Sequence, residues 1–188
     1  MEARSDPLGG RAQSSGPGPV PFTGQSTAAR RGAPRLRPVR GLLASCFGTG
    51  LIPRRLFGTD RGAGTVGAVV ALVPVVLLRT VGWGAQAVAA VILTMAAVWA
   101  AAPYTKTGED PQWINIDEAA GSALSVIGLD GLFWLPAFVV FRLADATKWP
   151  PGVAAAERLP GAIGVTADDV VAGLWGLAAG WLLKVVIA

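Results

Sequence analysis

The expected fold class rests on residues 62–105, GAGTVGAVVALVPVVLLRTVGWGAQAVAAVILTMAAVWAAAPYT. This stretch contains two apolar runs, residues 62–78 and 80–105, which only Arg79 separates. Seventeen uncharged residues are about the minimum for a helix that crosses a bilayer, and the twenty-six of the second run are ample. The two runs therefore predict a transmembrane helical hairpin.

A third apolar stretch, Ala119–Phe141, carries Asp130 near its centre, with Gly128 and Gly131 close by. A charge at the centre of a membrane span costs roughly 2.5–3.5 kcal/mol, and glycine is a poor residue for a helix interior. We therefore expect two half-helices in a re-entrant or interfacial hairpin. Such a hairpin returns both ends of the stretch to one side of the membrane.

The last apolar stretch, Val170–Ala188, has Lys184 near its end, where a lysine side chain can reach the membrane boundary. Apolar residues make up 52% of the chain and charged residues only 15%, which is typical of membrane proteins. The expected fold class is all-α: a polytopic membrane helical protein with a transmembrane hairpin, a re-entrant or interfacial helical hairpin and a C-terminal apolar helix.

Ten of the sixteen cationic residues precede the first apolar run. We interpret residues 1–41 as a disordered basic tail rich in Gly, Pro and Arg, and residues 42–188 as the membrane-embedded domain. The tail has only Phe22 to stack on a base, so no nucleic-acid partner is expected. The positive-inside rule places the tail in the cytoplasm, and the predicted hairpins return all later polar motifs there. The expected location is the cell inner (plasma) membrane.

Two adjacent carboxylates, Asp117 and Glu118, lie where a polar loop meets an apolar helix. Acidic residues stabilise a helix N-terminus by about 0.3–1 kcal/mol per charge, which is a structural explanation for either residue alone. A second pair, Asp168 and Asp169, precedes the last apolar stretch. Thr166 and Asp169 could form a variant capping box, but capping does not explain Asp168.

Arg142, Asp145 and Lys148 recur at intervals of three residues, so they can share one face of a helix. Arg142 and Lys148 could together bind a phosphate group. The alternative is an ordinary surface ion pair between Arg142 and Asp145, worth a few tenths of a kcal/mol. A glycine-rich turn, Gly62–Gly67, could likewise bind an anion through Gly64 and Thr65, or simply let helices pack closely.

The absence of certain residues and motifs excludes several catalytic mechanisms. The chain has no histidine, so histidine nucleophiles are excluded, and a D-x-D motif does not occur. The sole cysteine, Cys46, is followed six positions later by Ile52 and not by the arginine that cysteine-dependent phosphatases need. The remaining possibility is catalysis by a hard metal ion that is held by oxygen ligands. Carboxylates close to a bound phosphate favour Mg²⁺ as that ion.

Five motifs together resemble the phosphatidylglycerophosphatase A family. They are F-G-T-G (Phe47–Gly50), G-T-V-G (Gly64–Gly67), I-D-E-x-x-G from Ile116, F-R-x-x-D-x-x-K from Phe141, and G-x-x-G-x-x-x-D-D-V-V-A-G from Gly161. The resemblance implies Mg²⁺-dependent removal of the terminal phosphate from phosphatidylglycerophosphate, an anionic phospholipid, to give phosphatidylglycerol.

The resulting hypothesis gives each polar residue a role. Asp117, Asp145 and Asp168 are predicted to be catalytic, while Arg142, Lys148, Gly64 and Thr65 bind the substrate phosphate. Mg²⁺ is predicted to be held by Asp117, Glu118, Asp168 and Asp169. Two alternatives remain at this point: a small membrane cation transporter, and a catalytically idle lipid-binding homologue. The oligomeric state stays open.

Overall fold

The computed structural model describes residues 38–105 and 111–187, and it is built from helices with no strand among them. This confirms the all-α class. The expected basic tail lies outside the described residues up to position 37, and residues 38–41 belong to the first helix. The elements are α1 (Pro38–Ala44), η2 (Thr49–Leu51), α2 (Ile52–Phe57), α3 (Ala63–Leu77), η3 (Leu78–Thr80), α4 (Trp83–Ala101), α5 (Ile116–Ser125), α6 (Trp134–Thr147), α7 (Val153–Glu157) and α8 (Ala162–Ile187).

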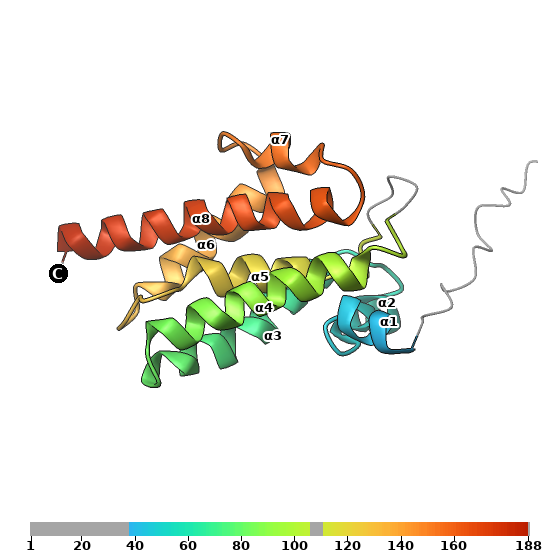
Figure 1. The fold of residues 1–188 in the computed structure, drawn as a ribbon, viewed down its shortest axis with the longest axis horizontal. Coiled ribbons are helices and arrows are strands. Elements are labelled where there is room, and N and C mark those ends of the chain that lie inside the picture. The colour runs from blue at the N-terminus through green and yellow to red at the C-terminus, as the bar shows by residue number, and fades with distance from the viewer. Residues whose placement is uncertain (1–37, 106–110, 188) are drawn as a thin grey trace, which may run out of the picture. The chain divides into compact units, whose positions relative to one another are not determined.

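Three of the described helices are long and apolar enough to cross a membrane: Ala63–Thr80, Trp83–Ala101 and Ala162–Ile187. The first two are the expected hairpin, and Figure 1 shows them running in opposite directions from the turn that joins them. Their outward faces carry large exposed apolar side chains, as lipid-facing helices do. On α3 and α4 these include Val73, Leu77, Val91, Ile92 and Met95.

The third span, α8, begins at Ala162, eight residues before the expected start at Val170. Gly161 adopts a left-handed backbone, with φ of +60°, and its carbonyl accepts the first helical hydrogen bonds. Thr166 and Asp169 therefore lie inside the helix, and the capping-box explanation was wrong. The start of α8 at Ala162 was not predicted, because a pair of carboxylates is unusual within a membrane helix.

The expected break at Asp130 is present. Helix α5 ends at Ser125 and α6 begins at Trp134, and the turn between them contains Gly128 (φ +73°) and Gly131 (φ +53°). The two helices run in opposite directions, so the start of α5 and the end of α6 lie at the same end of the bundle (Figure 1). This geometry allows residues at both ends of the hairpin to share one site.

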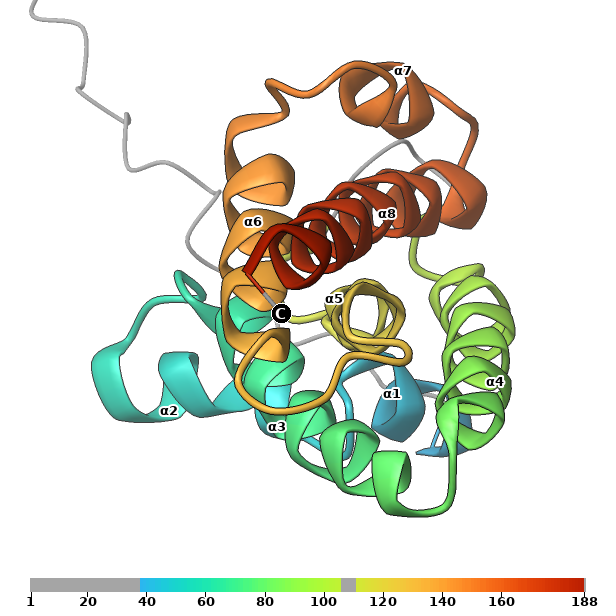
Figure 2. The ribbon, with the colours of Figure 1, turned by 90° about the vertical axis from the view of Figure 1, so that its left-hand side faces the viewer.

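Helix α5 occupies the centre of the bundle, surrounded by α3, α4, α6 and α8 (Figure 2). Most of its residues are small, and nearly all are buried. Small residues let helix backbones approach closely, because no side chain separates them. A Cβ atom added to Gly173 of α8, for example, would lie 2.7 Å from the carbonyl oxygen of Gly121 in α5.

We expect Gly173→Ala to destabilise the protein by about 1–3 kcal/mol, because the added methyl group forces α5 and α8 apart. Gly84→Ala is the matched control: Gly84 also lies in a helix, α4, but a Cβ there meets nothing within 4 Å. The measurement is the unfolding midpoint of the two purified variants in detergent. Equal midpoints would contradict the close packing of α5 against α8.

Candidate functional site

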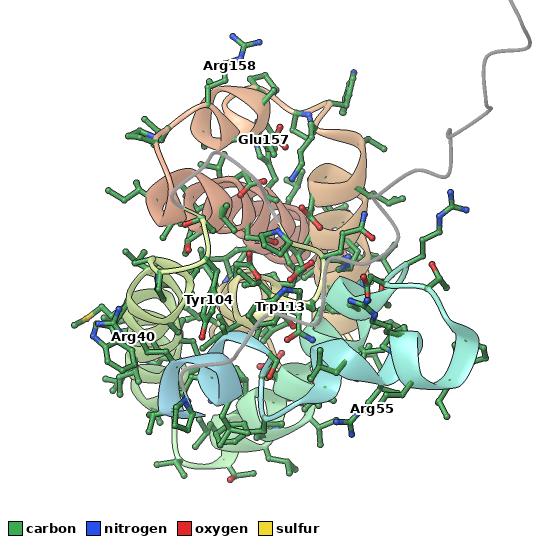
Figure 3. The ribbon with its side chains drawn as sticks, turned by 90° about the vertical axis from the view of Figure 1, so that its right-hand side faces the viewer. Arg40, Arg55, Tyr104, Trp113, Glu157 and Arg158 are labelled. Carbon is green, nitrogen blue, oxygen red and sulfur yellow. The ribbon has the colours of Figure 1, made fainter. Side chains whose placement is uncertain are left out.

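A polar cavity of about 330 Å³ opens at the end of the bundle where α3, α5 and α8 begin and α6 ends. Figure 3 views the bundle from this end. Every residue that the sequence singled out for the site lines the cavity, although the nine residues come from four helices and one helix cap. They are Gly64, Thr65, Asp117, Glu118, Arg142, Asp145, Lys148, Asp168 and Asp169.

Asp117 and Glu118 enter the cavity from the first turn of α5, after Asn115 at the N-cap. Asn115 fixes this turn against the start of α3, because its Nδ2 donates to the carbonyl of Ala63 at 3.0 Å and to Thr49 Oγ1 at 3.2 Å. Burial raises the pKa of Asp117. Burial, and then the charges of Asp117 and Asp169, raise the pKa of Glu118 well above its ordinary value.

Asp168 and Asp169 lie in the second turn of α8 and are both buried. Asp169 belongs to two groups of carboxylates, one with Asp117 and Glu118 and the other with Asp145 and Asp168. Within each group, one oxygen from each residue lies within 4.8 Å of the others. Asp169 therefore joins the acidic residues of α5 to those of α6 and α8.

The acidic residues fit a hard divalent cation. Glu118 Oε2, Asp168 Oδ1 and Asp169 Oδ1 are buried and have no hydrogen-bond partner among the described residues. Buried charges without partners are costly, and several carboxylate oxygens around one point are the ligands that Mg²⁺ or Ca²⁺ takes in proteins. Six carboxylates and three cations, Arg61, Arg142 and Lys148, line the cavity, so the site retains negative charge that a metal ion would balance.

Arg142 and Lys148 are held in the cavity by Asp145. Arg142 Nη1 donates to Asp145 Oδ2 at 2.7 Å, and Lys148 Nζ donates to Asp145 Oδ1 at 2.8 Å and to Asp168 Oδ2. The ion pair between Arg142 and Asp145 exists, but it is largely buried in the cavity wall rather than solvated. Burial alone would lower the pKa of Lys148, but Asp145 and Asp168 together raise it.

Gly64 and Thr65 form the wall of the cavity at the first turn of α3. A Cβ atom on Gly64 would lie 1.8 Å from Glu118 Oε1, so a side chain at this position would displace that carboxylate from its observed place. Thr65 Oγ1 lies 3.5 Å from Arg142 Nη2. Close helix packing and anion binding, the two explanations offered for this glycine-rich turn, are thus compatible with the same geometry.

Several lining residues were not predicted. Asp60 and Arg61 precede α3, Gln112 and Ile114 precede α5, and Val165 lies on α8. Arg61 was noted only as part of the basic N-terminal region. Asn115 was also missed as a positioning residue, although an asparagine just before a helix start is a recognisable N-cap signal.

Comparison with known proteins identifies the family. Residues 42–184 match the family described as "Phosphatidylglycerophosphatase A". A protein of Bacteroides thetaiotaomicron named "Putative phosphatidylinositol-3-phosphatase" is 32% identical over 154 residues, which cover 76% of this chain and 90% of that protein. No solved structure matches. The chain belongs to the phosphatidylglycerophosphatase A family, and it is a phosphoric monoester hydrolase.

Proposed function

We propose that the protein is a Mg²⁺-dependent phosphatidylglycerophosphatase, which hydrolyses the terminal phosphate of phosphatidylglycerophosphate to give phosphatidylglycerol in phospholipid biosynthesis. The observation that carries this proposal is the polar cavity in which six carboxylates, three cations and a glycine-rich helix start come together. Membership of the family supports the choice of substrate.

Asp117, Glu118, Asp168 and Asp169 are the proposed ligands of Mg²⁺. Glu118, Asp168 and Asp169 each have a buried oxygen without a hydrogen-bond partner among the described residues, and the lone pairs of such an oxygen are available to a metal ion. When bound there, Mg²⁺ would withdraw charge from the phosphoryl oxygens of the substrate. Asp145 is proposed to act beside them by orienting Arg142 and Lys148.

The substrate phosphate is proposed to lie against Arg142 and Lys148, with the free backbone N–H groups of Gly64 and Thr65 on its other side. In the reaction a water oxygen bonds to phosphorus, the bond from phosphorus to the glycerol oxygen breaks, and that oxygen takes up a proton. The fixed positive charges of the cavity stabilise the negative charge that spreads over the phosphoryl oxygens as this bond breaks.

The cavity is proposed to face the cytoplasm from the inner (plasma) membrane. Figure 3 shows Arg40, Arg55 and Arg158 at the cavity end, and Arg54 and Arg61 belong to the same end. Positively charged residues next to spans favour the cytoplasmic side. The opposite end has fewer cations, Arg79 and Lys184, and they share Asp130.

A cation transporter using the same carboxylates is disfavoured. A transport path needs polar groups along the spans, but the grouped carboxylates all lie at one end of the bundle. Asp130, at the other end, is half exposed in a turn. The acidic residues are thus arranged as a site on one face of the membrane.

A second substrate follows from the name of the Bacteroides relative: a phosphoinositide carrying its phosphate on the inositol ring. The family description favours the first substrate. The cavity volume of about 330 Å³ is large enough for either headgroup and does not discriminate between them.

The test compares the two lipids. We expect kcat/KM for phosphate release by the purified full-length protein to be at least about tenfold higher on phosphatidylglycerophosphate than on phosphatidylinositol 3-phosphate, each at the same fraction in otherwise identical vesicles. The reverse ratio would assign the phosphoinositide instead. Release from neither lipid would contradict the proposed function.

A further inference from the structure

A second cavity lies at the end of the bundle opposite the phosphatase site. Its volume is about 310 Å³, and its lining residues come from the turn before α4, the turn after α5 and the last part of α8: Arg79, Trp83, Ile127, Gly128, Leu177, Trp181 and Lys184. Sixteen residues of α8 separate Asp168 from Lys184, which corresponds to about 24 Å along the helix. The two cavities are therefore distinct.

The walls of this far cavity are apolar. Trp83, Ile127, Leu177 and Trp181 supply most of the surface. Tryptophan side chains are enriched at the level of lipid headgroups, because the ring is apolar and its N–H is polar. The cavity therefore suits a molecule with an apolar body that lies at the membrane boundary.

Three hydrogen bonds connect the segments that line the cavity. Trp181 Nε1 donates to the carbonyl of Ile127 at 3.1 Å. The backbone N–H of Gly128 donates to Gln86 Oε1 at 2.9 Å, and Gln86 Nε2 donates to the carbonyl of Val75 at 3.0 Å. A preformed site loses little conformational entropy when it binds a ligand.

Two cations, Arg79 and Lys184, line this cavity, and both lie near the same carboxylate, that of Asp130. Lys184 Nζ lies 2.9 Å from Asp130 Oδ2, whereas Arg79 Nη2 reaches the same oxygen only at 3.9 Å, beyond hydrogen-bond distance. The buried Nε of Arg79 has no hydrogen-bond partner among the described residues. An arginine with unused donors and a net positive charge complement an anion.

We propose that this far cavity binds one anionic phospholipid, whose phosphate contacts Arg79 and Lys184 and whose acyl chains lie against Trp83 and Trp181. Free phosphate or glycerol phosphate would contact the two cations but would make no contact with the apolar walls. A zwitterionic lipid would fill the walls but bring its own cation toward two others. Only an anionic lipid matches both the two cations and the apolar walls of the cavity.

Asp130 competes with the lipid phosphate for the same two cations. Its side chain is 51% exposed, and exposed ion pairs are weak, so a phosphate can displace it. Because of this competition, two kinds of substitution should change the affinity for the lipid in opposite directions. Removing a cation should weaken lipid binding, whereas removing the charge of Asp130 should strengthen it.

The experiment measures the affinity of the full-length protein for phosphatidylglycerol, phosphatidylcholine and glycerol 3-phosphate by native mass spectrometry of lipid adducts. We expect Arg79→Gln to weaken phosphatidylglycerol binding about tenfold or more, as loss of a charge-assisted hydrogen bond does. We expect Asp130→Asn, which keeps both cations, to tighten it. The control Arg158→Gln removes an exposed arginine at the opposite end and should change nothing.

The proposal is overturned if Asp130→Asn weakens phosphatidylglycerol binding, which would make Asp130 a structural clamp. It is also overturned if Arg79→Gln binds phosphatidylglycerol like the wild type, or if this substitution weakens the binding of phosphatidylcholine or glycerol 3-phosphate as much as that of phosphatidylglycerol. Lipid binding at the phosphatase cavity is common to all these variants and cancels in the comparison. Failure here therefore leaves the proposed function intact, and failure of that function leaves this site intact.

Discussion

Replacing Asp169 with asparagine is expected to lower kcat/KM for phosphate release by at least about 10³-fold, which corresponds to roughly 4 kcal/mol of transition-state stabilisation. Asp169 is the one carboxylate that belongs to both acidic groups of the cavity. Asparagine has nearly the same shape but no charge. The change therefore removes a proposed metal ligand and leaves the packing of α8 against its neighbours unaltered.

The same variant should be as stable as the wild type, or more stable, when Mg²⁺ is absent. Asp169 is 4% exposed and lies among Asp117, Glu118, Asp145 and Asp168. Like charges in a buried site repel one another, so an amide at this position relieves repulsion. The unfolding midpoint without metal is expected to hold or rise, and the increase that Mg²⁺ gives the wild type should disappear.

Glu157→Gln is the matched control for this prediction. Glu157 ends α7 at the same end of the bundle, and its side chain is exposed and outside the cavity (Figure 3). Its replacement changes the net charge equally but should leave activity and the response to Mg²⁺ unchanged. Full activity in Asp169→Asn, or a loss in Glu157→Gln of the same size, would refute the assignment of the metal site.

The sequence predicts the transmembrane hairpin and the broken third stretch well, because charges and glycines mark them directly. Arg61 and Arg79 bound the first span, and Asp130 between two glycines marks the turn of the second hairpin. The central position of α5 could not be predicted. Its alanine, glycine and serine residues give no strong hydropathy signal, and their burial depends on the four helices that surround them.

The identities of the site residues could be predicted, but their contacts could not. Motif spacing placed Arg142, Asp145 and Lys148 on one helical face, and the structure agrees. The bond from Lys148 to Asp168 crosses twenty residues, including α7, and no local pattern indicates it. The start of α8 was missed for a related reason: its carboxylates face the protein cavity, and hydropathy alone cannot distinguish that cavity from lipid.

We propose that a divalent cation bound to this acidic site makes the protein a phosphatidylglycerophosphatase. Removal of the metal is therefore expected to have an effect as large as that of Asp169→Asn. The cavity keeps an excess of negative charge without it, and Arg142 and Lys148 remain paired with Asp145 and Asp168 instead of the substrate. Mg²⁺ should restore activity better than Ca²⁺, which is larger and takes more ligands at longer distances.

The most direct measurement is phosphate release from phosphatidylglycerophosphate in vesicles by the purified full-length protein, first with a chelator and then with Mg²⁺ or Ca²⁺ added in excess. We expect the rate of phosphate release to be at least about 10³-fold lower with the chelator, and to recover fully with Mg²⁺ but only weakly with Ca²⁺. Undiminished phosphate release in the presence of the chelator would contradict the proposal.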